Sequence, residues 1–313
     1  MATSGSKDFT ATRDEIINGA IRILGRNENY KLERSLELSH AGQALNMMVK
    51  SWQAEGIGLW MNVEAALFLD DSNESYDLGS TGDHATASWV KTEVSTAGTS
   101  GSSTLVIDSG TGMTSSDNIG VQLDGGTMHW TTISSIPGAT TATLTTALTG
   151  PTAVDNHVYT YTTKLDRPLE ITEVRIRSDA DNETTIDIVS RDEYMELSDK
   201  DSTGQASMVY YDPQLTNGKL FVWPAEDDLK KYIKFTARLP FDDFDAAANN
   251  AEFPVEWLRV LKICLAAELS WEYELSSERI AMLTQRAEMA KRLLENFDSE
   301  HGTSVFFVPD RRY

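Results

Sequence analysis

Positive charge and cysteine are both scarce in this chain. Its 313 residues carry 27 Lys and Arg against 48 Asp and Glu, which gives a formal net charge of -21. Binding to nucleic acid through phosphate neutralisation requires Lys and Arg, so the composition argues against that kind of binding. The single cysteine, Cys264, excludes a disulfide-built fold and a thiolate zinc site, and it agrees with synthesis in a reducing compartment.

Long apolar runs are also missing. No run approaches the roughly 20 residues that a membrane-spanning helix needs, so we expect no membrane partner. The first residues are polar and lead into a predicted helix, which is unlike a secretory signal. Hydrophobic residues make up 40% and charged residues 24%, a composition typical of a globular protein with a sizeable core.

The chain lacks the sequence motifs of common enzyme classes. It has no GxxxxGK[ST] phosphate loop, no GxGxxG after a strand and no GxSxG elbow. The histidines stand singly, without HExxH or HxH spacing, at His40, His84, His129, His157 and His301. We interpret each as a structural or surface residue, and we expect no enzymatic activity, no catalytic residue, no bound metal and no cofactor.

One acidic stretch resembles the beginning of a calcium-binding loop. Asp179, Asp181 and Glu183 alternate as the first ligands of such a loop do. The sixth position is Thr184 instead of glycine, and no correctly spaced glutamate completes the loop. A solvated turn is the preferred interpretation.

The chain begins with two predicted helices. Thr12-x-x-Glu15 is a capping box, and Gly25 is placed to end the first helix. A longer helix is predicted from about Leu32 to Ala54. The apolar stripes of the two helices are Ile16, Ile17, Ala20, Ile21 and Leu24, and Leu38, Ala41, Leu45, Met48, Val49 and Trp52.

Two more helices are predicted toward the other end. One follows Phe253-Pro254, and the next starts at Ser276-Ser277 with Glu278 in its first turn. Their stripes are Trp257, Leu258, Leu261, Leu265 and Leu269, and Ile280, Leu283, Ala287, Ala290, Leu294 and Phe297. Because neither helix pair covers its own apolar face, we expect the two pairs to form one bundle.

The periodicity between the helix pairs changes to that of strands. Ala65–Leu69 is a predicted strand, with Ser75–Gly79 as its short partner across the turn at Asp71-Ser72-Asn73. After Pro168, further strands are predicted at Ile171–Ile176 and Thr184–Val189, then a helical turn at Arg191–Tyr194. A hairpin of Met208–Tyr211 and Lys219–Trp223 follows, and Lys230–Ala237 is expected to close the sheet.

Residues 88–163 differ in composition from the rest. There is no Lys or Arg from Thr92 to Thr163, and Ser, Thr and Gly exceed half of residues 95–150. Low complexity of this kind favours disorder, but regular alternation and the Gly125-Gly126 turn favour strands. We predict an inserted small β-domain here, either a sandwich or a barrel.

The predicted fold class is therefore α+β. A helical bundle is formed by the N-terminal and C-terminal helix pairs, and a central antiparallel β-region carries the inserted domain. The predicted boundaries are 1–58 and 242–297 for the two halves of the bundle, 59–87 and 164–241 for the central β-region, 88–163 for the inserted domain, and 298–313 for an extended tail.

The tail has an unusual composition for a chain end. It holds four consecutive apolar residues and a basic aromatic ending, at Val305, Phe306, Phe307, Val308, Pro309, Arg311, Arg312 and Tyr313. A chain terminus is normally polar. We interpret these residues as a docking segment whose arginines pair with acidic groups of a partner.

Several stretches resemble a known family. They are Arg13–Gly25, Leu45–Trp60, Arg191–Tyr194 with Lys200, Tyr210–Pro213 and Leu220–Pro224. Together they resemble the head-to-tail adaptor proteins of short-tailed bacteriophages, the tail tubular protein A-like or packaged-DNA-stabilisation group. The resemblance covers most of the chain outside residues 88–163.

This resemblance implies a structural protein of the virion, made in the host cytoplasm and placed at the head–tail interface. It implies a homo-oligomer, a dodecameric ring, between the portal protein and the tail nozzle or tail tube protein, with packaged DNA passing through the channel without sequence-specific binding. By the same resemblance, residues 304–313 insert between portal subunits. The inserted domain has no assigned partner, and tail fibres are one candidate.

Two alternatives remain open at this point. The first is another tail component, such as a nozzle or fibre-attachment protein. The second is a carbohydrate-binding or wall-acting protein that uses the β-domain at residues 88–163.

Overall fold

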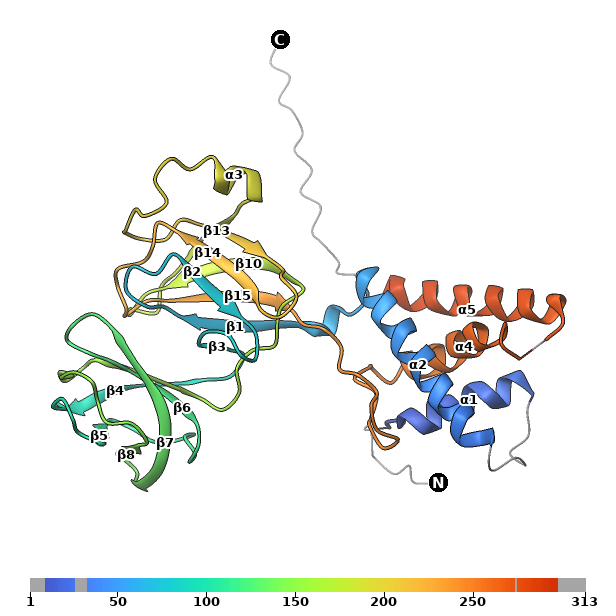
Figure 1. The fold of residues 1–313 in the computed structure, drawn as a ribbon, viewed down its shortest axis with the longest axis horizontal. Helices are drawn as coiled ribbons and strands as arrows, with labels where there is room; N and C mark the ends of the chain where they lie inside the picture. Colours follow the sequence, from blue (N-terminus) through green and yellow to red (C-terminus); the bar gives the residue numbers. More distant parts are fainter. Residues whose placement is uncertain (1–8, 26–32, 274, 298–313) are drawn as a thin grey trace, which may run out of the picture. The chain divides into compact units, whose positions relative to one another are not determined.

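We describe the fold from a computed structural model of the chain, which describes residues 9–25, 33–273 and 275–297. The chain divides into two compact units (Figure 1). We call Met1–Trp60 with Phe241–Tyr313 the helical unit, and Met61–Pro240 the β unit. The protein is therefore a mixed α+β protein.

Among its described residues, the helical unit contains four long helices. They are α1 (Arg13–Leu24), α2 (Glu33–Ala54), α4 (Trp257–Leu269) and α5 (Ser277–Phe297). A short 3-10 turn, η1 (Leu59–Met61), lies where the chain passes from this unit into the β unit. The predicted capping box of α1 is confirmed: the Glu15 amide donates to the Thr12 hydroxyl, and the Thr12 amide donates to the Glu15 carboxylate at 2.9 Å. Gly25 ends this helix at φ 83°, a left-handed conformation that glycine adopts without strain.

Helix α4 lies at the centre of the contacts in the helical unit. It contacts α1, α2 and α5, and α1 also contacts α2. Nine of its side chains are buried: Trp257, Leu258, Val260, Leu261, Ile263, Cys264, Leu265, Ala266 and Leu269. A helix that is apolar on nearly all sides needs neighbours on several sides, which explains its central place.

An aromatic cluster closes one end of this core. Trp52 and Trp60 both lie with ring centroids 5.7 Å from that of Trp257, and Phe253 stacks on Phe241 at 4.8 Å. Rings at these separations add to the burial energy through their edge and face contacts. The cluster connects α2 and α4 to the two segments that join the helical unit to the rest of the chain.

The β unit contains two sheets around one shared core (Figure 1). The first has the order β11-β10-β15-β1-β3, and the second has the order β12-β13-β14-β2. The strands of the first are β1 (Asn62–Phe68), β3 (Ala85–Thr86), β10 (Glu170–Arg177), β11 (Glu183–Thr185) and β15 (Tyr232–Arg238). Those of the second are β2 (Ser75–Leu78), β12 (Asp187–Ile188), β13 (Met208–Asp212) and β14 (Gly218–Trp223), and the short helix α3 (Arg191–Met195) follows β12.

One predicted strand pairing is wrong. β2 does not pair with β1; it pairs with β14 in the opposite sheet, and β15 pairs with β1 and β10. The connection between β1 and β2 includes Ser72 at φ 57°, and the Tyr76 hydroxyl bonds to the backbone of Asp70. The chain therefore arches from one layer to the other, so that Leu67 and Leu78 enter the same core.

The segment from Val90 to Tyr161 forms a closed six-stranded barrel in the order β4-β5-β8-β7-β6-β9. Of the two predicted alternatives, sandwich or barrel, the structure has the barrel. Its strands are β4 (Val90–Thr96), β5 (Thr104–Ile107), β6 (Asn118–Gln122), β7 (Met128–Gly138), β8 (Thr141–Leu144) and β9 (His157–Tyr161). Its interior is filled by Val94, Leu105, Ile107, Met113, Ile119, Val121, Leu123, Ile133, Ala142, Leu144, Leu148 and Val158.

The threonine-rich composition suits the outside of this barrel. Thr131 and Thr146 share a hydroxyl hydrogen bond of 2.6 Å, and Thr132 donates to Thr145 at 2.8 Å. Such pairs stabilise neighbouring strands, and β-branched side chains favour extended backbone. A segment with few large residues therefore folds because closure buries one apolar face completely and leaves no free edge.

The barrel also packs against the first sheet. Side chains alternate along β1, so Leu67 points into the sheet-on-sheet core while Phe68 points to the other face. There Phe68 stacks on Tyr159 of the barrel, with ring centroids 4.4 Å apart. Tyr161 and Tyr232 complete this second cluster. β1 is therefore buried on both faces over its last four residues.

Candidate functional site

The predicted docking residues, Val305 to Val308, Pro309, Arg311, Arg312 and Tyr313, lie outside the described residues. Their role stays a prediction. Within the residues that are described, two features stand out: an exposed apolar stripe on α5 and a cluster of ligating side chains around His157.

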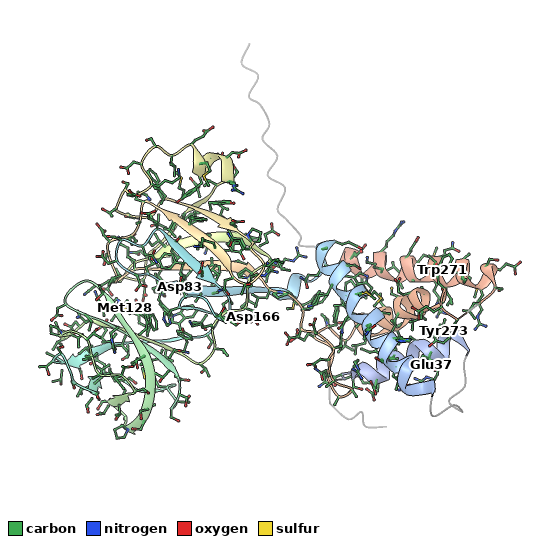
Figure 2. The ribbon with its side chains drawn as sticks, viewed as in Figure 1. Glu37, Asp83, Met128, Asp166, Trp271 and Tyr273 are labelled. Atoms are coloured by element: carbon green, nitrogen blue, oxygen red, sulfur yellow. The ribbon has the colours of Figure 1, made fainter. Side chains whose placement is uncertain are left out.

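The stripe on α5 consists of Met282, Met289 and Leu293, which are 61%, 59% and 71% exposed. Steps of seven and four residues place these three side chains on one side of a helix. The helix turns a different side toward the core, through the buried Leu283 and Ala287. Predicted stripe positions Ile280, Ala290 and Leu294 are only half-buried. Trp271, labelled in Figure 2, adds a ring that is 75% exposed just after α4.

The histidines of the β unit differ in how they are satisfied. The ring of His84 stacks on Trp130 at 3.7 Å and hydrogen-bonds to the Tyr161 hydroxyl. His129 uses both ring nitrogens, one with the Thr146 carbonyl and one with the Thr149 hydroxyl, each at 3.3 Å. These two agree with the interpretation of structural histidines. His157 does not.

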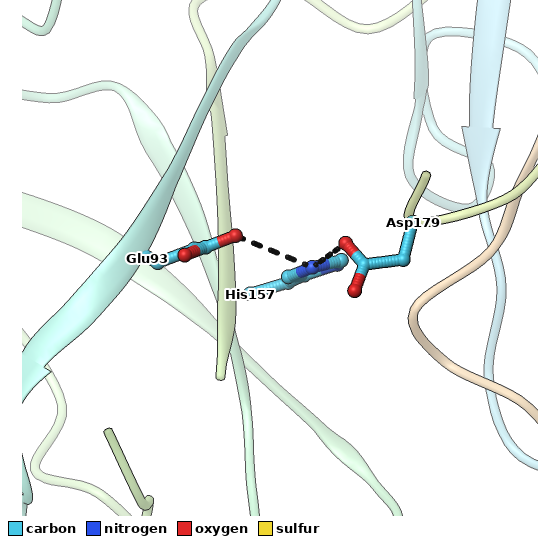
Figure 3. Close-up of side chains that lie close together, drawn as sticks. All are labelled: Glu93, His157 and Asp179. Atoms are coloured by element: carbon cyan, nitrogen blue, oxygen red, sulfur yellow. Dashed lines mark ion pairs between the residues drawn. The ribbon is translucent and has the colours of Figure 1, made fainter. Parts of the chain in front are cut away.

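His157 lies among carboxylates at the edge of the barrel (Figure 3). It is the first residue of β9, and its partner across the antiparallel ladder is Glu93 of β4. Asp179 approaches from the turn between β10 and β11. The His157 Nε2 atom is 2.7 Å from Asp179 Oδ1 and 3.7 Å from Glu93 Oε1. One ligand atom from each residue falls within 4.8 Å of the other two.

The position of His157 is set by the strand and by its other nitrogen. The side chain is fully buried, at 0% exposure. Its Nδ1 atom lies 3.0 Å from the Tyr159 hydroxyl, two residues along the same face of β9. Its Nε2 atom forms no well-directed hydrogen bond, although Asp179 Oδ1 lies within close polar contact of it.

The surroundings favour an uncharged imidazole. Burial lowers the pKa of His157, and the nearby Lys91 ammonium lowers it further, against the opposing effect of Asp179. Lys91 Nζ lies 3.3 Å from Asp179 Oδ1, and Lys230 Nζ lies 3.9 Å from Asp179 Oδ2. The site therefore combines one neutral nitrogen ligand with two partly exposed carboxylates, the kind of donor set that binds divalent metals.

Sequence reasoning missed this cluster. Glu93 was not singled out, His157 was interpreted as an isolated histidine, and Asp179 as part of a solvated turn. Sequence spacing carries no signal for residues that meet from three strands or turns. One signal was available: β9 alternates His157, Tyr159 and Tyr161, and all five of its residues are buried. Aromatic residues on the outward face of a barrel strand predict that another part of the protein covers that face. A histidine buried there needs polar partners for its ring nitrogens.

Nucleophile chemistry has little support in the described residues. Burial raises the pKa of the Cys264 thiol to about 12, so the reactive thiolate is scarce at neutral pH.

No helix in the described part of the chain is long and apolar enough to cross a membrane. In comparisons with known proteins, neither a family model nor a curated protein matches this chain.

Proposed function

We propose that this chain is a structural protein of a short-tailed phage virion, an adaptor that joins the portal to the tail. In this proposal the four helices act as one bundle that meets the portal, and the β unit faces the tail. Copies of the chain assemble as a ring, through which packaged DNA passes. The proposal includes no catalytic step.

The observation that carries the proposal is the make-up of the helical unit. Helices from both ends of the chain, separated by a whole β unit, contact one another through α4. The same unit exposes the apolar stripe Met282, Met289 and Leu293. A stripe of this kind suits an interface with another helix, since monomeric proteins rarely expose aligned large apolar side chains.

Charge gives further support. A net charge of -21 keeps a DNA-facing surface from adhering to the phosphate backbone, because adhesion depends on Lys and Arg. The resemblance at Arg13–Gly25, Leu45–Trp60 and Leu220–Pro224 supplies the specific role. These stretches overlap α1, the C-terminal part of α2 with the residues after it, and β14. Solubility alone also explains a high net charge, so charge is secondary support.

The test is whether the chain binds the portal protein of the same virion. Binding is detected by sedimentation and by measuring the mass of the complex. We expect the full chain to form a ring-sized complex with portal, and deletion of residues 304–313 to abolish it. A Met282→Glu, Leu293→Glu double variant should weaken binding at least tenfold. The matched control is Leu215→Glu, since Leu215 is 96% exposed and lies in the β unit. If the full chain shows no association with portal, the adaptor role is wrong.

A further inference from the structure

We propose that Glu93, His157 and Asp179 form a binding site for a divalent transition-metal ion of the zinc or cobalt type. The site lies between the barrel and the β10–β11 turn, within the β unit. It is independent of the adaptor role.

The first argument is the state of His157 Nε2. This nitrogen is buried, forms no well-directed hydrogen bond even with Asp179 Oδ1 at 2.7 Å, and points between two carboxylates. A buried polar atom without a partner costs free energy, and a lone pair facing two negative groups adds repulsion. A cation placed among the three groups removes both costs.

The second argument is the support behind the histidine. Nδ1 has its own partner, the Tyr159 hydroxyl at 3.0 Å. When Nδ1–H donates to that oxygen, the lone pair of Nε2 is left for a metal. Metal-bound histidines in proteins are commonly held in this way, with the second nitrogen donating to a fixed oxygen.

The third argument is distance. Metal–ligand bonds of about 2.0–2.1 Å in a tetrahedron separate the ligand atoms by about 3.3 Å. The observed separations from Nε2, 2.7 Å to Asp179 and 3.7 Å to Glu93, lie on either side of this value. The backbone that carries the three ligands is held in place. Glu93 and His157 are ladder partners, and two backbone hydrogen bonds from Ser178 to residues 181 and 182 close the turn that holds Asp179.

The ligand types select the metal class. One imidazole and two carboxylates suit Zn²⁺, Co²⁺ or Mn²⁺, whereas Ca²⁺ prefers oxygen ligands throughout. Glu93 and Asp179 are 36% and 48% exposed, which leaves space for a water molecule as the remaining ligand. Bound metal would link β4 and β9 of the barrel to the turn that follows β10, and so stabilise the barrel on the sheet.

The competing explanation is an ion-pair network. Lys91 and Lys230 already neutralise part of the charge on Asp179, and a protonated His157 would pair with both carboxylates. In that case the cluster has no use for a metal, and added metal changes nothing.

The experiment uses the full chain, treated with chelator and then titrated with ZnCl₂ or CoCl₂. We expect one ion bound per chain by calorimetry, a cobalt absorption spectrum typical of nitrogen and oxygen ligands, and a higher Tm. Glu93→Gln and Asp179→Asn should each weaken binding at least about tenfold, and His157→Gln should abolish it. His129→Gln is the control, because His129 is a buried barrel histidine with both nitrogens satisfied, and it should bind as the wild type does.

Two outcomes would overturn the proposal. One is the absence of saturable binding to the wild-type chain. The other is unchanged affinity in Glu93→Gln and Asp179→Asn, which places any bound ion elsewhere on this acidic protein. These two positions are partly exposed, so the variants should fold even if His157→Gln does not.

Discussion

His84 should make the stability of the β unit depend on pH. Burial, together with the nearby Lys164 ammonium, lowers the pKa of this histidine to about 3. The ring stacks on Trp130 and bonds to Tyr161, so its neutral form is built into the junction between barrel and sheet. In the unfolded chain the same group has its ordinary pKa of 6.5.

The sign follows from proton uptake. Between pH 6.5 and about 3 the unfolded chain binds a proton at His84 that the folded chain does not bind. The contribution to stability is therefore complete above pH 6.5 and is lost as pH falls through this window. From pH 6.5 to 4.5 the upper limit is about 2.7 kcal/mol, at about 1.36 kcal/mol per pH unit. Because the ring is only half-buried, we expect about 2 kcal/mol.

The assay is urea unfolding of wild type and His84→Gln at pH 7.5, 6.5, 5.5 and 4.5. Glutamine keeps a polar side chain but does not titrate, so the free energy of unfolding of the wild type should fall toward that of the variant as pH is lowered. Other titrating groups cancel in the difference. A difference that stays constant across this range would refute the reasoning, as would an NMR titration of His84 with a midpoint near 6.5.

Two further predictions concern the β unit. Glu226 is buried and pairs with Lys231 at 2.8 Å, so Glu226→Gln should lower the free energy of unfolding by on the order of 3 kcal/mol. The control is Asp228→Asn, because Asp228 is a partly exposed partner of the same lysine, and it should lower the free energy of unfolding by under about 1 kcal/mol. A Cβ at Gly120 would lie 2.5 Å from the Trp130 ring, so Gly120→Ala should lower stability by about 1–3 kcal/mol. Equal stability of Gly120→Ala and wild type would contradict this packing.

Local sequence was sufficient for the elements whose causes are local. The capping box at Thr12 and the glycine at position 25 define both ends of α1. Gly125-Gly126 and Asn217-Gly218 lie at turns of hairpins that the structure contains. Alternation within residues 88–163 was enough to predict an ordered β segment, because β-branched side chains and turn glycines act within a few residues of themselves.

Tertiary structure decided which segments meet. Alternation along Ala65–Leu69 shows that the strand has two faces, but it does not identify the strand that pairs with it. The predicted pairing with Ser75–Gly79 is wrong, because β1 pairs with β15 and β2 pairs with β14. The His157 cluster has the same origin, since Glu93 and Asp179 reach it from β4 and from the turn after β10. Residues distant in sequence come together only when sheets stack and barrels close. The helices and their caps were therefore determined largely by the sequence itself. The layer of each strand, the side of α5 that is buried and the grouping around His157 depended on long-range packing.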